Sequence, residues 1–400
     1  VLFLAFHVGD FIFSIAAGPI FLFMMDRFLR FCQSRKKVSV VSAKTLPCGT
    51  VELVLSKPAS LRYNALSFVF LQLRELSWLQ WHPFSVSSSP LDGKHHLSVL
   101  IKVLGGWTDK LTRKLNNNSE EASAVDLPSE TFPGITVSVE GPYGHEVPYH
   151  LMYEHLILVA GGIGISPFLA ILSDILHLLN EGRPCLPRNV MVIWAIKKSD
   201  ELPLLSTIDM EKICPSFSAK LNLDIQIFVT RETESSVEEG RANEVSSSPA
   251  YPTRTKGHGM SVLVGTGHNV WSGLYILSST LGLVVLLYLL DTFYINPLGI
   301  TTWWYKGLLF IGCMVASIVV FGGVVIGFWH LWEKKSLARD EYDDERSEID
   351  EADFNEDMIN TDLDRKIRSG STMIHYGSRP DFTDILSSVT KRWGHVDIGV

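Results

Sequence analysis

Residues 156–167 read LILVAGGIGISP, a continuous apolar run that leads through a glycine-rich turn to a proline. An apolar run of this length, bounded by glycines, predicts a buried strand, and the stretch Pro167–Leu179 predicts a helix after the turn. Glycines let the backbone approach a diphosphate, and the free N–H groups at the start of a helix favour negative charge. The candidate phosphate-binding residues of this turn are Gly161, Gly162, Gly164, Ser166 and Pro167.

Two residues at the end of the turn suit the start of a helix. The Ser166 hydroxyl is able to cap the helix, and Pro167 fits its first turn, where a proline loses no hydrogen bond. The turn does not follow the G-x-G-x-x-G fingerprint, so a purely structural turn is the alternative. Its position between a strand and a helix favours dinucleotide binding.

The segments on either side of the turn predict two kinds of sheet. Downstream, the apolar runs Val190–Ile196 and Leu223–Val229 continue an alternation of strands and helices, which predicts a parallel, doubly wound sheet. Upstream, short alternating runs predict antiparallel strands instead. These runs are Val51–Leu55, Leu97–Val103 and Ile135–Val139. We therefore expect an α/β fold in which a small antiparallel β-barrel precedes a nucleotide-binding domain.

Three further segments are long and apolar enough to cross a bilayer as helices. They are Phe11–Phe31, Trp271–Leu290 and Trp303–Trp332. Lys and Arg residues follow the first and third segments and precede the second, so the positive-inside rule places the globular parts in the cytosol. The second and third segments are expected to form a membrane hairpin, and the short link between them contains Asp291, Asn296, Pro297 and Gly299. A buried soluble helix is the alternative for the first segment.

Composition excludes some classes of protein. The chain of 400 residues is 46% hydrophobic with a net charge of −8, which argues against nucleic acid as a partner. Its five cysteines contain no C-x-x-C pair, which favours reduced domains over a disulfide framework. The chain starts at Val1 and stops in a strand-like stretch, Val396–Val400, so we expect an internal fragment of a longer protein. The segment 338–364 is expected to be an acidic linker.

The cluster Trp81-His82-Pro83-Phe84-Ser85 is the most informative one outside the glycine-rich turn. Pro83 favours an extended backbone at His82, which presents alternate side chains to one surface. Phe84 is able to stack on a flat redox ring and Ser85 to hydrogen bond with it. A strand with a packed aromatic ring is the alternative.

Two other clusters offer groups that suit a cofactor. Lys102, followed by Gly106-Trp107-Thr108, supplies a cation, a small residue and a hydroxyl for a second diphosphate. Gly141-Pro142-Tyr143-Gly144 comes at the junction of barrel and sheet, where a crevice between domains would open, although a Gly-Pro pair is usually only a turn.

Taken together, these clusters resemble the ferredoxin-reductase-like half of ferric reductases and NADPH oxidases, and most nearly the plant ferric-chelate reductases. The resemblance covers nearly the whole chain, and its motifs are specific jointly rather than singly. The motifs that carry it are HVGD (7–10), HPFSVSSSP (82–90), VLIKVLGGWTDKL (99–111), LVAGGIGISPF (158–168) and HYGSRPDF (375–382).

The resemblance implies a role for each cluster. Phe84 and Ser85 would face the isoalloxazine of FAD, and the glycines of the first turn would hold the NADPH diphosphate. Thr230-Arg231 would bind the adenosine 2′-phosphate, for which a guanidinium is chemically apt. The supporting residues implied near FAD are His82, Pro83, Lys102, Gly106, Trp107 and Thr108, those at the junction are Gly141, Tyr143 and Gly144, and those near the 2′-phosphate are Tyr376 and Arg379.

His7 is implied as an axial ligand of haem b on a membrane helix, and imidazole suits haem iron. Composition alone favours an ordinary interfacial histidine at this position. The family's other haem ligands would precede Val1, and its Cys-Gly-Pro motif would follow Val400.

The domain organisation expected from these inferences has six segments. They are 1–37, the end of a haem domain; 38–150, a ferredoxin-reductase-like FAD barrel; 151–265, the NADPH domain; 266–332, the inserted hairpin; 333–370, the acidic linker; and 371–400, the NADPH domain continued.

The expected function is electron transfer from cytosolic NADPH through FAD and haem to ferric chelates, with a lipid bilayer as surroundings and no obligate protein partner. A superoxide-generating NADPH oxidase is the alternative enzyme, and the hairpin favours the ferric reductase. A transporter or membrane-tethered binding protein is the alternative of another class, but the three spans carry few charged groups that could line a path. The plasma membrane is the expected location, with the plastid envelope as the second possibility.

Overall fold

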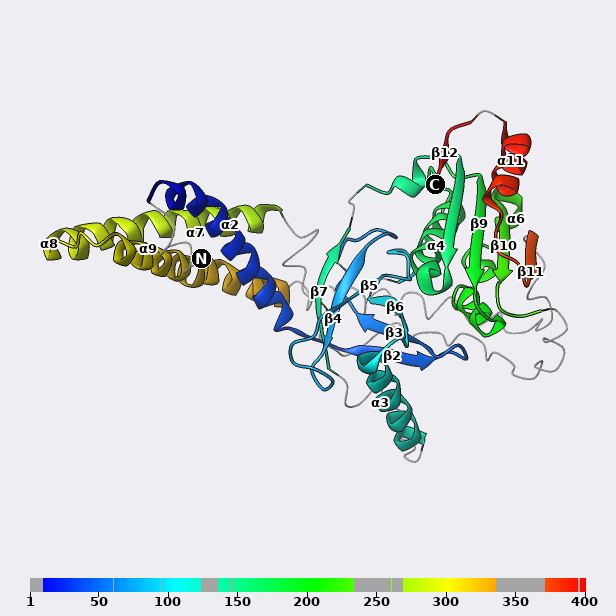
Figure 1. Ribbon diagram of the computed structural model, residues 1–400, viewed down its shortest axis with the longest axis horizontal. Helices are drawn as coiled ribbons and strands as arrows, with labels where there is room; N and C mark the ends of the chain where they lie inside the picture. The colour runs from blue at the N-terminus through cyan, green and yellow to red at the C-terminus, as the bar shows by residue number, and fades with distance from the viewer. Residues whose placement is uncertain are drawn as a thin grey trace, which may run out of the picture. The chain divides into compact units, whose positions relative to one another are not determined.

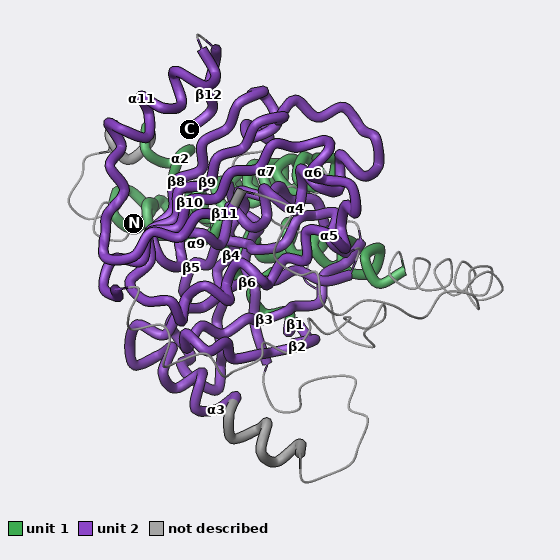
Figure 2. Tube along the Cα trace, turned by 90° about the vertical axis from the view of Figure 1, so that its right-hand side faces the viewer, with its two compact units in different colours: residues 1–36, 261–359 green, residues 37–260, 360–400 purple. Residues whose placement is uncertain are grey.

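The computed structural model describes residues 10–59, 61–93, 95–123, 136–144, 147–233, 260, 269–335, 371–394 and 396–400. The chain divides into two compact units, one of residues 1–36 with 261–359 and one of residues 37–260 with 360–400 (Figure 2). The first unit is helical. The second contains all the strands of the described part.

The helical unit is built from three long helical stretches. Helix α2 is Asp10–Ser34, and α7 is Asn269–Leu290, which continues through a π-helical turn, Asp291–Ile295, into α8, Asn296–Leu298. Helix α9 is Trp303–Ser317, and it continues through Ile318–Gly322 to residue 335. The predicted link is therefore shorter than expected, because helix persists to Leu298 and only residues 299–302 turn. Gly299 ends the helix with a φ of 57°, a conformation that favours glycine.

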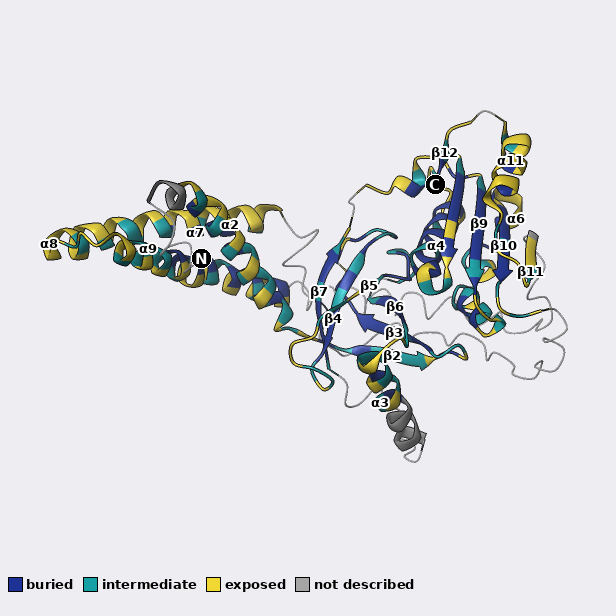
Figure 3. Ribbon diagram, in the orientation of Figure 1, coloured by how far each residue is buried: buried dark blue, intermediate teal, exposed yellow. Residues whose placement is uncertain are grey.

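Two helical stretches of this unit are long and apolar enough to cross a bilayer, Asn269–Leu298 with 30 residues and Trp303–Lys335 with 33. At about 1.5 Å per residue each exceeds the ~30 Å hydrocarbon core. Their apolar side chains are largely exposed within the unit (Figure 3). A third helical stretch, Gly162–Asn180, is also long and apolar enough to cross a bilayer. However, 61% of its apolar 18-residue segment is buried, so it is a core helix of the other unit.

Helix α2 packs against the hairpin. Tyr275 donates a hydrogen bond from its hydroxyl to the carbonyl oxygen of Met25 at 3.0 Å, and Lys36 pairs with Glu333 at 3.0 Å. The shared apolar core consists of Ala17, Phe21, Met25, Tyr275, Met314, Ile318 and Ile326. The three segments predicted to span a membrane are therefore helices that group in one unit.

Two small antiparallel sheets form the first part of the other unit. One has the order β1 (Lys37–Val38), β7 (Val137–Tyr143), β4 (Phe68–Leu73), β5 (His82–Ser85), and the other the order β2 (Val40–Thr45), β3 (Thr50–Ser56), β6 (His96–Lys102). A bridge between Val86 and Val99 joins the two sheets. The predicted antiparallel strands are confirmed as β3, β6 and β7. Helix α3, Gly106–Ser123, was not predicted.

A five-stranded parallel sheet forms the second part. Its order is β11 (Ser371–Tyr376), β10 (Asn222–Val229), β9 (Asn189–Ile196), β8 (His155–Gly161), β12 (Ile398–Gly399). The strand-like stretch at the end of the chain is β12, which pairs in parallel with β8 through Ile398 and His155. The strand order changes direction beside β8, and open parallel sheets bind ligands at the carboxyl ends of strands at such a point.

Helices cover both faces of the parallel sheet (Figure 1). Helix α4 (Ser166–Asn180) packs on one face, together with η3 (Ser199–Thr207), α5 (Met210–Ile213) and α6 (Phe217–Lys220). Helix α11 (Phe382–Trp393) buries Ile385 and Val389 on the other face. The predicted doubly wound sheet is therefore confirmed.

Candidate functional site

The glycine-rich turn lies at the carboxyl end of β8, as predicted. Gly161 ends β8, the 3₁₀ turn η2 spans Gly162–Ile165, and α4 begins at Ser166. Gly162 has a φ of 52°, and open space lies where a side chain would stand at Gly161 and Gly164. The indole of Trp194 on β9 donates to the carbonyl oxygen of Gly162 at 2.9 Å, which fixes the turn to the sheet.

The prediction that Ser166 caps α4 is wrong. Its backbone is already helical, with φ −47° and ψ −53°, because the 3₁₀ turn runs directly into α4, and a capping residue needs an extended backbone. The Ser166 hydroxyl is instead buried and has no hydrogen-bond partner among the described residues. Pro167 lies in the first turn of α4, as predicted. The Ser166 N–H donates to the carbonyl oxygen of Ile163 and Pro167 has no N–H, so the unpartnered hydroxyl is the donor that this residue still offers to a ligand oxygen.

Three aromatic rings gather around the predicted flavin-binding strand. The rings of His82 and Trp107 lie 4.5 Å apart between centroids, and Phe84 stacks on Trp107 at 6.1 Å with an interplanar angle of 24°. The Nε2 atom of His82 and the Nε1 atom of Trp107 are buried without partners among the described residues. Buried polar atoms normally have partners, so these two are candidates for hydrogen bonds to a ligand.

The cluster at Gly106 forms the first turn of α3, a helix that was not predicted. The hydroxyl oxygen of Thr108 accepts from the N–H groups of Leu104 and Gly105, at 3.0 and 3.1 Å. The same hydroxyl donates to the carbonyl oxygen of Gly105 at 2.9 Å. Thr108 thus stabilises the first turn of α3 by hydrogen bonds. Trp107, in the same turn, places its ring in the aromatic cluster with His82 and Phe84.

Lys102 lies beside the glycine-rich turn. Its Nζ atom donates to Oε2 of Glu201 at 2.8 Å, and Glu201 is only 4% exposed. A Cβ atom placed on Gly162 would lie 3.3 Å from this Oε2 and 3.7 Å from Nζ. The predicted FAD-side cation and the predicted NADPH-side glycine are therefore neighbours. Sequence reasoning missed Glu201, because the stretch Ser199–Leu202 looks like an ordinary polar surface turn.

The Gly141-Pro142-Tyr143 segment forms the end of β7 rather than a turn, and it is tightly built. Gly141 and Gly144 have φ values of 125° and 133°, and a side chain at Gly144 would approach the carbonyl oxygen of Leu66 at 3.1 Å. The Tyr143 hydroxyl donates to Glu140 at 2.6 Å, and its ring contacts Phe68 at 5.7 Å. The backbone therefore requires these glycines whether or not a ligand binds here.

The residues predicted to bind the adenosine 2′-phosphate lie beyond the ends of two neighbouring strands. Thr230 follows β10, and its hydroxyl donates to the carbonyl oxygen of Ile196 at 2.9 Å. Arg231 is exposed directly after it. Tyr376 ends the adjacent β11 opposite Val229, and Arg379 is exposed three residues later. Both arginines thus follow the carboxyl ends of adjacent parallel strands.

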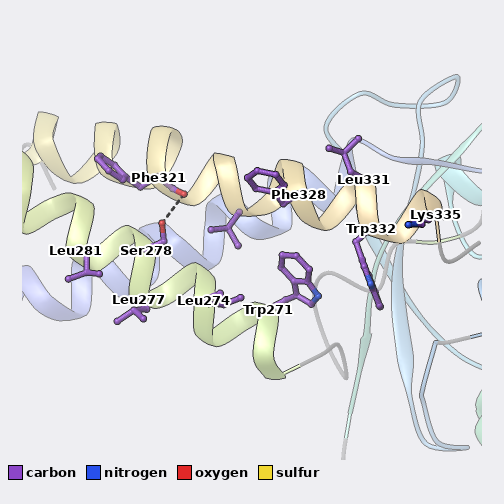
Figure 4. Close-up of a pocket in the computed structure, with 11 residues that line it drawn as sticks. Trp271, Leu274, Leu277, Ser278, Leu281, Phe321, Phe328, Leu331, Trp332 and Lys335 are labelled. Carbon is purple, nitrogen blue, oxygen red and sulfur yellow. Dashed lines mark hydrogen bonds between the residues drawn. The ribbon is translucent and has the colours of Figure 1, made fainter.

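The expected haem ligand His7 lies outside the described residues. Across the described ranges no group of three or more His, Cys, Asp or Glu side chains is arranged to hold a metal ion. An open apolar groove of about 790 Å³ lies along the hairpin (Figure 4). It is lined by residues such as Trp271, Phe321, Phe328 and Trp332 and includes none of the predicted cofactor-binding residues.

Two protein-family models match this chain, one over each of the two proposed nucleotide-binding parts. A model of the FAD-binding domain matches residues 35–147, and a model of the ferric reductase NAD binding domain matches residues 153–400. These ranges contain the aromatic cluster and the glycine-rich turn, respectively.

Several plant proteins are similar to the chain. It is 57% identical over 409 residues to ferric reduction oxidase 7, chloroplastic, of Arabidopsis thaliana, across 100% of the chain and 54% of the relative. Probable ferric reduction oxidase 1 of Arabidopsis thaliana is 32% identical over 394 residues, 96% of the chain and 53% of the relative. Respiratory burst oxidase homolog protein E of the same plant is 34% identical over 168 residues, 40% of the chain and 17% of the relative. The chain spans about half the length of the ferric reduction oxidases.

Proposed function

This chain belongs to the ferric reductase family, and we propose that it carries electrons from NADPH through FAD and haem b across a membrane to ferric chelates. The resemblance drawn from the sequence motifs is confirmed, as are the FAD-binding and NAD-binding domains. The observation that carries the proposal is the contact between Lys102 and Glu201 at Gly162. It brings the predicted FAD site and the predicted NADPH site together within one compact unit.

The residues at the barrel fit a flavin nucleotide. Phe84 and Trp107 offer flat apolar surface, which excludes water and supports a planar ring by stacking. The unpartnered nitrogens of His82 and Trp107 offer two buried hydrogen-bonding positions. Lys102 supplies a positive charge at the end of β6, and we propose that it divides its interactions between Glu201 and the FAD diphosphate.

The residues at the parallel sheet fit a nicotinamide dinucleotide. Gly161 and Gly164 leave open space that a Cβ atom would fill, so a diphosphate can approach the backbone there. The Ser166 hydroxyl, which has no partner among the described residues, would donate to one of its oxygens. Arg231 and Arg379 follow adjacent strands, and we propose that they pair with the 2′-phosphate that distinguishes NADPH from NADH.

FAD bound at this site would supply the redox chemistry, which is the acceptance of a hydride from NADPH and the release of single electrons. The side chains of this chain need not transfer protons. Their task is to hold two rings in register and to exclude water, so that hydride moves only between the cofactors. His7 would hold one haem at the membrane end of the chain.

Ferric chelates are favoured over oxygen as the acceptor. Ferric reduction oxidases 7 and 1 match 100% and 96% of the chain, whereas the respiratory burst oxidase homologue matches 40%. Superoxide generation is the second candidate, since that homologue is 34% identical over 168 residues.

The protein is a multi-pass membrane protein by its apolar helices. The name of the relative with 57% identity, which is chloroplastic, supports the plastid envelope over the plasma membrane as its location. We therefore propose the plastid envelope. Fractionation of plant cells that express a tagged full-length protein tests this, and recovery with plasma-membrane markers would contradict it.

The visible spectrum of the purified full-length protein tests the function. On anaerobic addition of NADPH, the flavin absorbance should bleach first and the reduced haem bands should follow. Reduction of Fe(III)-EDTA should then exceed superoxide output under air. A protein that binds no flavin, or that produces superoxide without reducing the chelate, would contradict the proposal.

A further inference from the structure

A reciprocal pair of hydrogen bonds joins the loop after β5 to helix α4. The Ser89 hydroxyl of the loop donates to Oδ1 of Asp174 on the helix at 2.9 Å. The Ser173 hydroxyl of the helix donates back to Oδ1 of Asp92 in the loop. Each side therefore contributes one serine and one aspartate. We call Ser89, Asp92, Ser173 and Asp174 the serine–aspartate clasp.

A histidine supports each carboxylate of the clasp. Nε2 of His150 lies 2.9 Å from Oδ2 of Asp174, and Nε2 of His177 lies 2.9 Å from Oδ1 of Asp92. Within the described ranges, no Lys or Arg forms an ion pair with either aspartate. Between the loop and the helix the two carboxylates thus bond to hydroxyl and imidazole groups, whose bonds are directional and hold the loop and the helix in one orientation.

The clasp is largely buried. Ser89 is 0% exposed, Ser173 1%, Asp174 8% and the supporting His150 3%. A buried carboxylate that loses a partner pays the full cost of its lost hydration, so sliding of the loop against the helix is strongly disfavoured.

Further bonds fix the loop itself. The Ser89 N–H donates to Oδ2 of Asp92 at 2.5 Å, and the Tyr63 hydroxyl donates to the carbonyl oxygen of Ser89 at 3.0 Å. Burial, and secondarily the carboxylates of Asp92 and Asp174, raise the pKa of Tyr63 well above its ordinary value. Tyr63 therefore stays a neutral donor, and the loop side of the clasp is rigid.

The clasp connects the two segments that carry the proposed cofactor sites. Ser89 follows Ser85, the last residue of β5, by four positions. Asp174 lies eight residues after Ser166, which corresponds to about 12 Å along α4. The clasp therefore lies outside both predicted cofactor sites, but it bonds the strand of one to the helix of the other.

We propose that the serine–aspartate clasp is the positioning device that aligns the nicotinamide with the flavin for hydride transfer. This inference rests on the function proposed above. Hydride transfer needs reacting atoms within about 3–3.5 Å, and a misplacement of about 1 Å can cost on the order of 100-fold in rate. A helix that carries the dinucleotide turn must therefore be held firmly against the strand that carries the flavin.

The test uses the full-length protein loaded with FAD, with flavin reduction by saturating NADPH followed by anaerobic stopped-flow. Asp174→Ala should lower the rate per bound flavin at least ~10-fold, while the flavin content and the apparent Kd for NADPH change less than about twofold. Asp174→Asn keeps an oxygen that accepts from Ser89, so it should recover most of the rate. Adding Ser89→Ala to Asp174→Ala should slow the reaction no further, because both changes break the same bond.

Asp209→Ala is the matched control. Asp209 caps the short helix α5 by accepting from the N–H of Lys212, so its removal costs stability without touching the clasp. It should lower the melting temperature and leave the rate per flavin unchanged. If the Asp174→Ala protein does not bind FAD, the rate of flavin reduction per bound flavin is measured instead in the milder variants Ser89→Ala and Ser173→Ala. A fall in that rate then supports the inference.

Three results overturn the inference in distinguishable ways. A wild-type rate per flavin in the clasp variants shows that the clasp has no part in alignment. A loss confined to stability, as in Asp209→Ala, shows a purely structural role. Absence of flavin reduction by NADPH in the wild-type protein refutes the proposed function and this inference with it.

Discussion

A methyl group at Gly162 tests whether the glycine-rich turn binds the dinucleotide. In Gly162→Ala the added Cβ would lie 3.3 Å from Oε2 of Glu201 and 3.7 Å from Nζ of Lys102. The first distance is tighter than ordinary contact, so the carboxylate must move by a few tenths of an ångström. The methyl group would therefore disturb the ion pair at the point where the two proposed sites meet.

The size of the effect has two parts. Gly162 has a φ of 52°, and an alanine in the left-handed region costs roughly 1 kcal/mol, which lowers the melting temperature by about 2–4 °C. The second part is the loss of close approach between backbone and diphosphate. We expect the second-order rate of flavin reduction by NADPH to fall at least ~10-fold, equivalent to about 1.4 kcal/mol. The FAD content should stay within about twofold.

Gly182→Ala separates the two parts. Gly182 follows α4 with a φ of 64°, and nothing lies within 4 Å of where its Cβ would stand. The same backbone strain is then introduced away from the turn. Both variants should lose similar stability in a thermal melt, and only Gly162→Ala should lose rate in the stopped-flow assay. Equal rates in the two variants would refute the reasoning.

Three further predictions follow from single side chains. Arg231→Gln should raise the KM for NADPH about tenfold in a Fe(III)-chelate assay, because it removes a phosphate-binding guanidinium. The KM for NADH should stay unchanged, and equal changes in both KM values would contradict the assignment. Lys102→Met should lower both the FAD content and the thermal stability, since it leaves the buried Glu201 carboxylate unpaired. Adding Glu201→Gln should restore the stability but not the FAD content. A restored FAD content would show that Lys102 does not bind FAD. Burial of Lys57 lowers its pKa to about 8 from 10.5, so the unfolded chain binds more protons between these pH values and stability rises with pH across that window. Lys57→Met should abolish this slope in urea unfolding, and an unchanged slope would contradict it.

The regular strands could be predicted because burial leaves a local signature. The continuous apolar run Val190–Ile196 lies within β9, which is covered on both faces, and Pro167–Leu179 lies within α4. A strand buried on both sides must be apolar at successive positions, so its pattern does not depend on which neighbours it meets.

Helix α3 was missed for the opposite reason. Its sequence is mostly polar and begins with glycine, so it looks like a loop, and only Trp107, Leu111 and Leu115 carry the helical spacing. Leu111 and Leu115 are buried, at 0% and 2% exposure. Three apolar residues at intervals of four are a signal that the sequence contained, but one too short to outweigh the polar composition.

The prediction that Ser166 caps α4 was wrong because serine is a suitable capping residue, but the Ser166 backbone is helical rather than extended. A serine before a proline at the start of a helix normally caps it, yet here the preceding turn is already helical. The backbone of a cap depends on the path by which the chain enters the helix, and that path is set by how β8 and the sheet place the turn.

The apolar strands of the parallel sheet, the glycine-rich turn with the helix after it and the three apolar helices were determined by the sequence alone, since each rests on residues adjacent along the chain. The contacts of Lys102 with Glu201 and of Ser89 with Asp174 join positions 99 and 85 residues apart. They depend on how the antiparallel sheets and the parallel sheet dock. Only the tertiary structure decides such pairs, because a side chain's partner across an interface follows from the packing of whole layers rather than from the periodicity of either one.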